Sequence, residues 1–400
     1  MNRRSKMELK SYQKRLYAEI DLDAVKHNYL AAKASCPGKI VMCVIKANAY
    51  GHGAVELGQL YVSLGAEMFA VSNIEEGMEL RRAGISVPIL NLGYAPAECA
   101  DVLASENIEQ CLPSLEYARA LSAAANDAGV TVRVHLKIDT GMGRIGFLCR
   151  SEEENELEEL LSAARLSSLS VVGSFTHLAI ADTGDAGEEY TRGQARMFNF
   201  AIEYLKKNGV DPGLLHLSNS AAIYEYPDLA INAIRPGISL YGETASHDYR
   251  STPDLKVTCT LRTYVAYVKN IRKGDSVGYG RAFVADRDMR VATLPVGYSD
   301  GLLRSYSYGK GIFTVNGKPC PVLGRMCMDQ TMIDVTDAGE VSLGTPVTIF
   351  GNGAVKTAGT LADTVGTIPH ENITNISRRV PRVYIEGGRI VKITDYVIGN

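Results

Sequence analysis

The sequence predicts an α/β protein, in which a (β/α)8 barrel precedes a mainly β C-terminal domain. Three observations carry this prediction. A chain of 400 residues is longer than one ordinary domain and fits a barrel with a second domain attached. Between residue 38 and about residue 240, eight short apolar runs alternate with helical patterns. After about residue 250, strand-like runs follow one another with turns between them.

The eight apolar runs of the first part are the expected barrel strands. Most are rich in β-branched residues and free of charge, as strands of a parallel sheet buried on both faces are. Eight βα units favour a closed barrel over an open doubly wound sheet, which would normally have fewer strands. No GxGxxG sequence follows the first run. The runs lie at residues 40–47, 68–72, 88–93, 108–114, 132–139, 170–177, 214–220 and 230–236.

Amphipathic stretches between these runs predict the barrel helices. Several of them end at a glycine suited to a helix C-cap, as at Gly65, Gly84, Gly129 and Gly209. The acidic segment 151–159 predicts a solvent-facing first helical turn capped by Ser151 rather than a metal or partner site. The helical stretches lie at residues 54–64, 74–83, 115–128, 151–166 and 188–207.

The second part of the chain predicts a separate β domain. Asn316-Gly317 and Gly387-Gly388 are hairpin signals, and one helix is expected near residues 360–365. The polar segment 247–254 is the expected linker, so the predicted division is an N-terminal extension (1–15), the barrel (16–250) and the C-terminal β domain (251–400). The strand-like runs lie at residues 256–268, 291–296, 312–315, 332–335, 347–350 and 383–393.

Composition excludes several classes of protein. A net charge of −3 argues against nucleic acid or an anionic membrane as the main partner. The longest apolar run, residues 40–45, is far shorter than the ~20 residues that span a bilayer, and the basic N-terminus has no apolar segment behind it. Eight cysteines without a CxxC pair suggest free thiols in a reducing compartment, so we expect a cytoplasmic protein with no metal site.

Charged and hydrogen-bonding residues gather at the predicted strand ends, where barrels place their chemistry. Lys46 closes the first apolar strand, although burying an ammonium group is costly. It either reaches out to solvent at the rim or has a lowered pKa and forms a Schiff base. Other strand ends carry Lys137, Arg144, His177, His216, Ser220 and Arg235. Together they describe a positive pocket for a phosphorylated or carboxylated ligand, with Ser220 and the amides of Gly237 and Ile238 as candidate phosphate donors.

The segment around Lys46, VIKANAYGHG (44–53), resembles the signature around the pyridoxal phosphate lysine of bacterial alanine racemases. The resemblance extends over about residues 15–390 and is specific because several motifs occur in the same order and spacing. The other motifs are KIDTGMGR (137–144), NSAA (219–222), RPGI (235–238), GYG (278–280), GYSDG (297–301) and GRMCMDQ (324–330).

The resemblance implies a pyridoxal phosphate enzyme whose homodimer completes each active site with the partner's β domain. Lys46 would hold the cofactor and act as one catalytic base, and Tyr279 from the other subunit, oriented by His216, would act as the second. Arg235 would face the pyridine nitrogen. Arg144 and Met328 would bind the substrate carboxylate, and Lys137 behind Arg144 would be a candidate for carbamylation. Further cofactor contacts would come from Tyr50, His177, Asn219, Ser220, Gly237 and Ile238, with Tyr298 and Asp329 at the entrance.

One position departs from the family. Arg378 stands where the family frequently has a tyrosine that reaches the phosphate and the substrate side chain. It either replaces that tyrosine without effect or binds the phosphate and alters the pocket wall.

The expected function is interconversion of L- and D-alanine for peptidoglycan. A serine or broad-specificity racemase remains an alternative, and so do a non-catalytic pyridoxal phosphate-binding protein and a decarboxylase. The candidate second base Tyr279 counts against a non-catalytic carrier, which needs no such base. Arg235 counts against a decarboxylase, because decarboxylases of this fold group generally have an acidic residue at the pyridine nitrogen.

Overall fold

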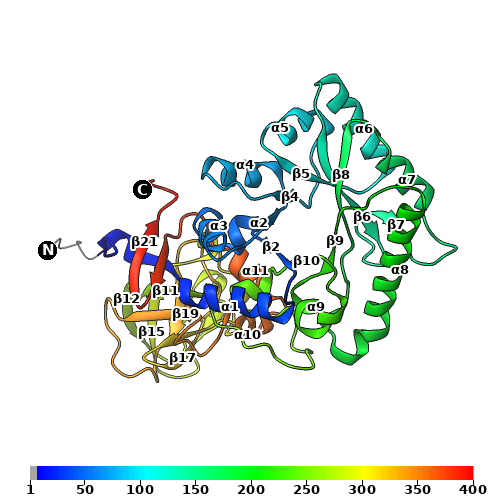
Figure 1. Cartoon of the computed structure of the whole chain (residues 1–400). Helices are drawn as coiled ribbons and strands as arrows, with labels where there is room; N and C mark the ends of the chain where they lie inside the picture. The colour runs from blue at the N-terminus through cyan, green and yellow to red at the C-terminus, as the bar shows by residue number, and fades with distance from the viewer. Residues whose placement is uncertain (1–6, 400) are drawn as a thin grey trace.

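The N-terminal half of the computed structural model, which describes residues 7–399, is a closed barrel of parallel strands (Figure 1). The strand order is β5-β4-β3-β2-β10-β9-β8-β6, and pairing of β5 with β6 closes the ring. Each of the eight predicted runs overlaps one of these strands, so the predicted fold class is confirmed. They are β2 (Ile40–Val44), β3 (Met68–Val71), β4 (Ile89–Asn91), β5 (Ile108–Leu112), β6 (Val132–Asp139), β8 (Leu169–Phe175), β9 (Leu214–Ser218) and β10 (Ala233–Ile234), with the short β7 (Phe147–Leu148) beside β6.

Helices surround the barrel, and their positions match most of the predicted stretches. The exception is the predicted stretch 151–166, in which the helix begins at Leu157 and not at Ser151. The Ser151 hydroxyl accepts hydrogen bonds from the amides of Glu153 and Glu154 and so caps a turn that precedes the helix. The helices are α1 (Leu22–Ser35), α3 (Ala54–Ser63), α4 (Ile74–Arg82), α5 (Ala100–Ser105), α6 (Leu115–Asp127), α7 (Leu157–Ala164), α8 (Glu188–Lys207) and α9 (Ser220–Glu225), together with α2 (Lys46–Tyr50), described below.

The C-terminal domain is built on a seven-stranded sheet in the order β17-β16-β19-β11-β1-β20-β21. Two small sheets, β12-β15-β18 and β13-β14, and the helices α10 (Ala358–Asp363) and α11 (Pro369–Thr374) complete it. Both predicted hairpin turns lie between paired strands. The strands are β11 (Cys259–Tyr264), β12 (Tyr267–Ile271), β13 (Ser276–Val277), β14 (Phe283–Val284), β15 (Met289–Leu294), β16 (Ile312–Val315), β17 (Lys318–Pro321), β18 (Thr331–Asp334), β19 (Pro346–Phe350), β20 (Arg382–Glu386) and β21 (Arg389–Thr394).

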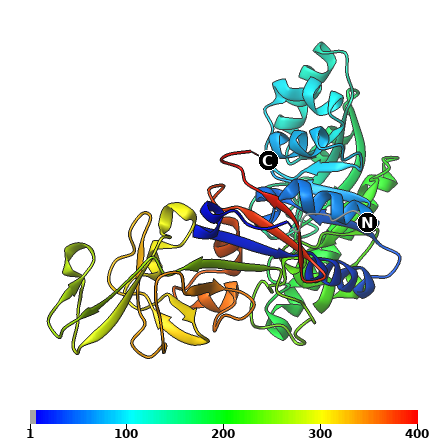
Figure 2. The same ribbon diagram turned by 90° about the vertical axis from the view of Figure 1, so that its left-hand side faces the viewer.

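The start of the chain belongs to this second sheet and not to the barrel. Strand β1 (Leu16–Asp21) pairs antiparallel with β11 and parallel with β20, as Figure 2 shows for the blue strand beside the red ones. The predicted boundary at residue 16 was therefore wrong, because β1 lies in the β domain and the chain enters the barrel only after it. Of the predicted extension 1–15, residues 1–6 lie outside the described part.

A continuous apolar core joins the two domains. It runs from barrel residues such as Val41 and Ile45 to sheet residues such as Leu261 and Ile349. At the junction, α2 and α11 pack backbone against backbone: a Cβ on Gly51 would lie 2.1 Å from the Ile373 carbonyl oxygen. This contact fixes α11 beside the carboxyl ends of the barrel strands. No helix among residues 7–399 has the length and apolar character to span a membrane.

An ion pair joins Arg15, at the end of the turn Ser11–Arg15, to Asp300 of the C-terminal domain. This pair leads to a prediction about stability. Arg15 donates hydrogen bonds to both carboxylate oxygens of Asp300, at 2.7 and 3.1 Å, and the Asp300 side chain is fully buried. Arg15→Ala leaves that carboxylate with the Gly297 amide and the more distant Arg379, so the free energy of unfolding should fall by about 2 kcal/mol. Urea denaturation measures this change. Lys206→Ala, which breaks a solvent-exposed pair, should change it by less than about 0.5 kcal/mol, and equal effects would contradict the assignment.

Candidate active site

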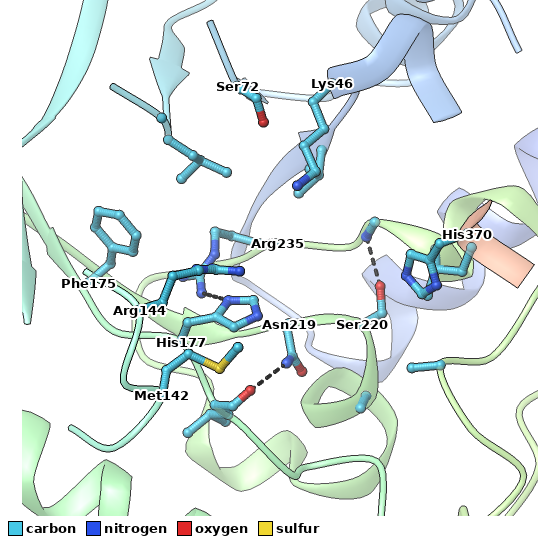
Figure 3. Close-up of a pocket in the computed structure, with 18 of the residues that line it drawn as sticks. Lys46, Ser72, Met142, Arg144, Phe175, His177, Asn219, Ser220, Arg235 and His370 are labelled. Atoms are coloured by element: carbon cyan, nitrogen blue, oxygen red, sulfur yellow. Dashed lines mark hydrogen bonds between the residues drawn. The ribbon is translucent and has the colours of Figure 1, made fainter. Parts of the chain in front are cut away.

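A pocket of about 800 Å³ lies at the carboxyl ends of the barrel strands. Figure 3 shows Lys46 pointing from one side of it toward Arg235, Arg144 and His177 on the opposite side. The pocket brings together ten of the residues predicted from the sequence: Lys46, Tyr50, Lys137, Arg144, His177, Asn219, Ser220, Arg235, Gly237 and Ile238.

The segment that carries Lys46 has an unusual backbone. Ala47, Asn48, Ala49 and Tyr50 all have φ between 51° and 54°, the left-handed region that residues with a Cβ rarely occupy. Hydrogen bonds from the Ala47 amide to Glu76 and from the Ala54 amide to the Asn48 side chain hold this turn in place. Strain of this kind is concentrated at functional sites, and here it orders the chain between Lys46 and Tyr50.

Positive charge dominates the pocket. Burial, and then the charge of Arg144, lowers the pKa of the Lys46 amine, and burial lowers the pKa of Lys137 to about 8. The Lys137 side chain is 2% exposed and donates a hydrogen bond of 2.7 Å to the Ile138 carbonyl. A neutral amine is the nucleophilic form of lysine, so the burial of Lys46 favours covalent attachment of a carbonyl compound.

Arg235 is held in a dense set of hydrogen bonds. Its Nη1 donates to Nδ1 and the carbonyl oxygen of His216, both at 2.8 Å, and its Nη2 donates to the carbonyls of Thr176 and Leu217 and contacts Nδ1 of His177 at 3.4 Å. Among the described residues, its Nε–H alone has no such partner. Burial lowers the pKa of Arg235 to about 9, so the group remains a cation at neutral pH.

A chain of hydrogen bonds leads from Arg235 to a buried carboxylate on the far side of the barrel. Because arginine only donates, Nδ1 of His216 must accept, and Nε2–H of His216 then donates to Nδ1 of His135 at 2.9 Å. Nε2–H of His135 donates to Glu109 at 2.8 Å, and Arg133 binds the other oxygen of Glu109 at 2.6 Å. Burial alone would raise the pKa of Glu109, but the hydrogen bond from His135 and the charge of Arg133 lower it, so the chain ends on an anion.

This arrangement corrects the role predicted for His216. That side chain is fully buried and both of its ring nitrogens are already bonded, so it cannot orient a tyrosine at the pocket. His177, which lines the pocket, is the histidine that can do so. Burial and the charge of Arg235 hold the pKa of His177 well below its usual value. With Nδ1 against Arg235, the neutral ring carries its proton on Nε2.

The other end of the pocket is a cradle of hydroxyl and amide groups. The Gly237 amide donates to the Ser220 hydroxyl at 2.8 Å, and a Cβ on Gly237 would come within 2.9 Å of the Tyr50 hydroxyl. Asn219 holds the adjacent turn through bonds to Leu178 and Ala222. A lysine, a hydroxyl-lined cradle and an arginine with one unused N–H therefore match the aldehyde, phosphate and pyridine nitrogen of pyridoxal phosphate, so the residues present fit that cofactor.

Six predicted residues lie outside this pocket: the buried His216 and five residues of the C-terminal domain. Tyr279, Met328 and Asp329 line a separate hollow of about 590 Å³ in the C-terminal domain. Tyr279 is 71% exposed and Met328 is 54% exposed. Asp329 accepts hydrogen bonds from Ser299 and Arg379, and Tyr298 lies in the neighbouring turn.

Arg378 is also absent from the pocket wall. Its guanidinium lies 3.6 Å from Glu79 and above the ring of Tyr396, which favours the alternative in which Arg378 replaces the tyrosine without contacting a phosphate. An exposed carboxylate and an aromatic face satisfy the charge better than the already cationic pocket would. Two residues of α11 that the sequence analysis missed, His370 and Thr374, line the pocket instead. Their only sequence signal is nearness to the predicted site residue Arg378.

Comparison with known proteins identifies this constellation. The family model for the alanine racemase N-terminal domain matches residues 20–245, and that for the alanine racemase C-terminal domain matches residues 258–384. The chain belongs to the alanine racemase family. A racemase of this family is an isomerase that acts on amino acids, so the predicted enzyme class is confirmed and a non-catalytic carrier or a decarboxylase is not supported.

Relatives resemble this racemase over almost its whole length. Alanine racemase 1 of Clostridium acetobutylicum is 42% identical over 96% of this chain and 98% of its own. The solved structure of the Clostridium difficile alanine racemase is 37% identical, covers 96% of this chain and 99% of its own, and superimposes with a TM-score of 0.89. The Bacillus anthracis alanine racemase, solved with bound L-Ala-P, is 35% identical over 96% of this chain and 98% of its own, also with a TM-score of 0.89.

The hydrogen-bond chain behind Arg235 predicts an effect of Glu109, which does not itself line the pocket. Glu109→Gln keeps an acceptor for His135 but removes the negative charge, so the orientation of His216 and Arg235 should weaken. We expect kcat to fall about 10-fold, whereas KM for the amino acid should change less than about twofold. Steady-state kinetics measure both constants. The exposed Glu116→Gln is the control, and a change confined to KM would refute this role.

Proposed function

We propose that this racemase interconverts L- and D-alanine and uses pyridoxal phosphate held by Lys46. The observation that carries the proposal is the arrangement of three groups around one pocket: a lysine with a lowered pKa, an arginine with one unused N–H, and a hydroxyl cradle. Pyridoxal phosphate, when bound, withdraws electrons from the α-carbon of an attached amino acid and so eases loss of its α-proton. Ser220, Tyr50 and Gly237 would hold its phosphate, and Arg235 would face its ring nitrogen.

Racemisation requires removal of a proton from one face of the α-carbon and delivery of a proton to the other. We propose that Lys46 serves one face and Tyr279 of the partner subunit serves the other. Tyr279 is largely exposed and lies outside the pocket of its own chain, as does Met328. A second copy of the chain that brings these residues to the pocket would complete the site, which supports a homodimer with shared active sites.

His177 would assist the tyrosine. Its ring is neutral and carries its proton on Nε2, because Nδ1 faces Arg235. A donor N–H directed at a phenolic oxygen stabilises the ionised form of the phenol, which is the form that accepts a proton. Arg235 would bias the same histidine, so the buried hydrogen-bond chain would act on both the cofactor and the second base.

We propose alanine rather than serine as the main substrate. Arg144 lies in the pocket and supplies a cation for the substrate carboxylate. Arg378 does not line the pocket, so its departure from the family pattern leaves the wall beside the substrate without an added polar group. A serine or broad-specificity racemase remains the second candidate. Carbamylation of Lys137 is consistent with its lowered pKa of about 8, while cytoplasmic location and supply of D-alanine for peptidoglycan stay predictions.

Lys46→Ala should abolish activity because it removes the covalent anchor and one base together. We expect racemisation of L-alanine to fall at least about 10³-fold, and the visible absorbance of attached cofactor to disappear. Chiral chromatography of the product measures the first effect, and L-serine in parallel ranks the two substrates. The surface variant Lys206→Ala is the control. Turnover near that of the wild type in Lys46→Ala would exclude the proposed mechanism.

Tyr279→Phe tests the shared site. Racemisation should fall about 10²-fold, while exchange of the α-proton of one enantiomer with deuterated solvent persists through Lys46. The exposed Tyr267→Phe, in the same domain, should have no such effect.

Mixing Lys46→Ala subunits with Tyr279→Phe subunits should then restore activity. Random pairing makes half of the dimers mixed, and each mixed dimer has one intact site of two, so recovery should approach about one quarter of wild-type activity. Absence of recovery in a sample shown to contain mixed dimers would rule out a site completed in trans.

A further inference from the structure

His370 is a half-buried residue with an enclosed ring nitrogen for which the mechanism above has no use. It lies on α11 of the C-terminal domain, yet it lines the barrel pocket together with Lys46 and Tyr50. Its Nδ1 is enclosed and, among the described residues, has no hydrogen-bond partner. No partner is found for Nε2 within residues 7–399 either.

The position of His370 associates it with one end of the pocket. Its ring centroid lies 5.9 Å from that of Tyr50, whose hydroxyl lies beside Gly237 and Ser220. Figure 3 shows the imidazole on the same side of the pocket as Ser220, which accepts a hydrogen bond from the Gly237 amide, and away from His177 and Arg144. His370 therefore belongs to the hydroxyl-lined cradle and not to the side of the pocket that carries the arginines.

An imidazole without hydrogen-bond partners in the wall of the cradle is unfavourable for the stability of the folded protein. A buried polar atom without a hydrogen bond destabilises the folded state, and a phenyl ring would pack against Tyr50 without that cost. Burial, and then the charge of Lys46, lowers the pKa of His370 to about 4. The ring is therefore neutral at pH 7 and has one N–H to donate, which suits an anionic acceptor.

We propose that His370 donates a hydrogen bond to the phosphate of the bound cofactor. The proposal rests on the function proposed above and adds a phosphate ligand from the C-terminal domain to the ligands of the barrel. Hydrogen bonds to a phosphate dianion are charge-assisted and stronger than those between neutral groups. The backbone contact of Gly51 with Ile373 fixes α11, so a bond from His370 would couple cofactor binding to the packing of the two domains.

Comparison of pyridoxal phosphate with pyridoxal, which lacks the phosphate, isolates this bond. The full-length protein, stripped of cofactor, is titrated with each compound and binding is followed by absorbance. His370→Phe keeps the ring but removes its nitrogens, so the affinity for pyridoxal phosphate should fall about 10-fold or more. The affinity for pyridoxal should change less than twofold. The ³¹P resonance of the bound phosphate should shift in the same variant.

His370→Asn retains a donor and should recover part of the affinity, and it decides the matter if His370→Phe does not fold. His247→Phe, at an exposed histidine paired with Asp363, is the control. Equal losses for both compounds, or an unchanged affinity for pyridoxal phosphate, would overturn the proposal. An unchanged affinity with a raised KM for alanine would assign His370 to the substrate instead. Failure of the wild-type protein to bind pyridoxal phosphate at all would refute the proposed function itself.

Discussion

The buried guanidinium of Arg235 is the constraint on which the rest of the site depends. A cation in the interior of a barrel must have its donors satisfied and its charge balanced, and both needs are met by residues from several strands. Carbonyls and two histidines take up its terminal N–H groups, and His216 and His135 connect it to the carboxylate of Glu109. Gly173 on β8 leaves space for this chain, because a Cβ there would lie 2.2 Å from Nδ1 of His135.

The same constraint determines the chemistry that the pocket can support. Once its other donors are bonded, Arg235 has a single N–H for a ligand, and an arginine does not release that proton at neutral pH. A ring nitrogen bound there would remain unprotonated and withdraw electrons less strongly. Burial lowers the pKa of Lys46 and Lys137, with a further contribution from Arg144, and the cations of the pocket suit it to anionic ligands. Weaker electron withdrawal shortens the lifetime of a carbanion at the α-carbon. Such a site therefore favours rapid return of a proton, as in racemisation, over side reactions such as transamination.

The barrel and much of the pocket could be predicted from the sequence, because apolar runs and the residues at their ends are local features. Non-local features could not. The pairing of β1 with β11 and β20 joins segments over 200 residues apart, and nothing in residues 16–21 indicates it. His216 and His177 both lie near strand ends, but only their orientation separates a buried support from a pocket residue. His370, for which no role was expected from the sequence, lines the pocket and Arg378 does not, because α11 packs against α2 through a contact between backbones.

The central claim is that Arg235, fixed by a buried hydrogen-bond chain, keeps the ring nitrogen of the cofactor unprotonated. The most direct test is ¹⁵N NMR of the full-length protein loaded with pyridoxal phosphate labelled at the ring nitrogen. The predicted result is the chemical shift of an unprotonated pyridine that accepts a hydrogen bond and does not titrate between about pH 6 and pH 8. The shift of a pyridinium nitrogen at neutral pH would contradict the claim.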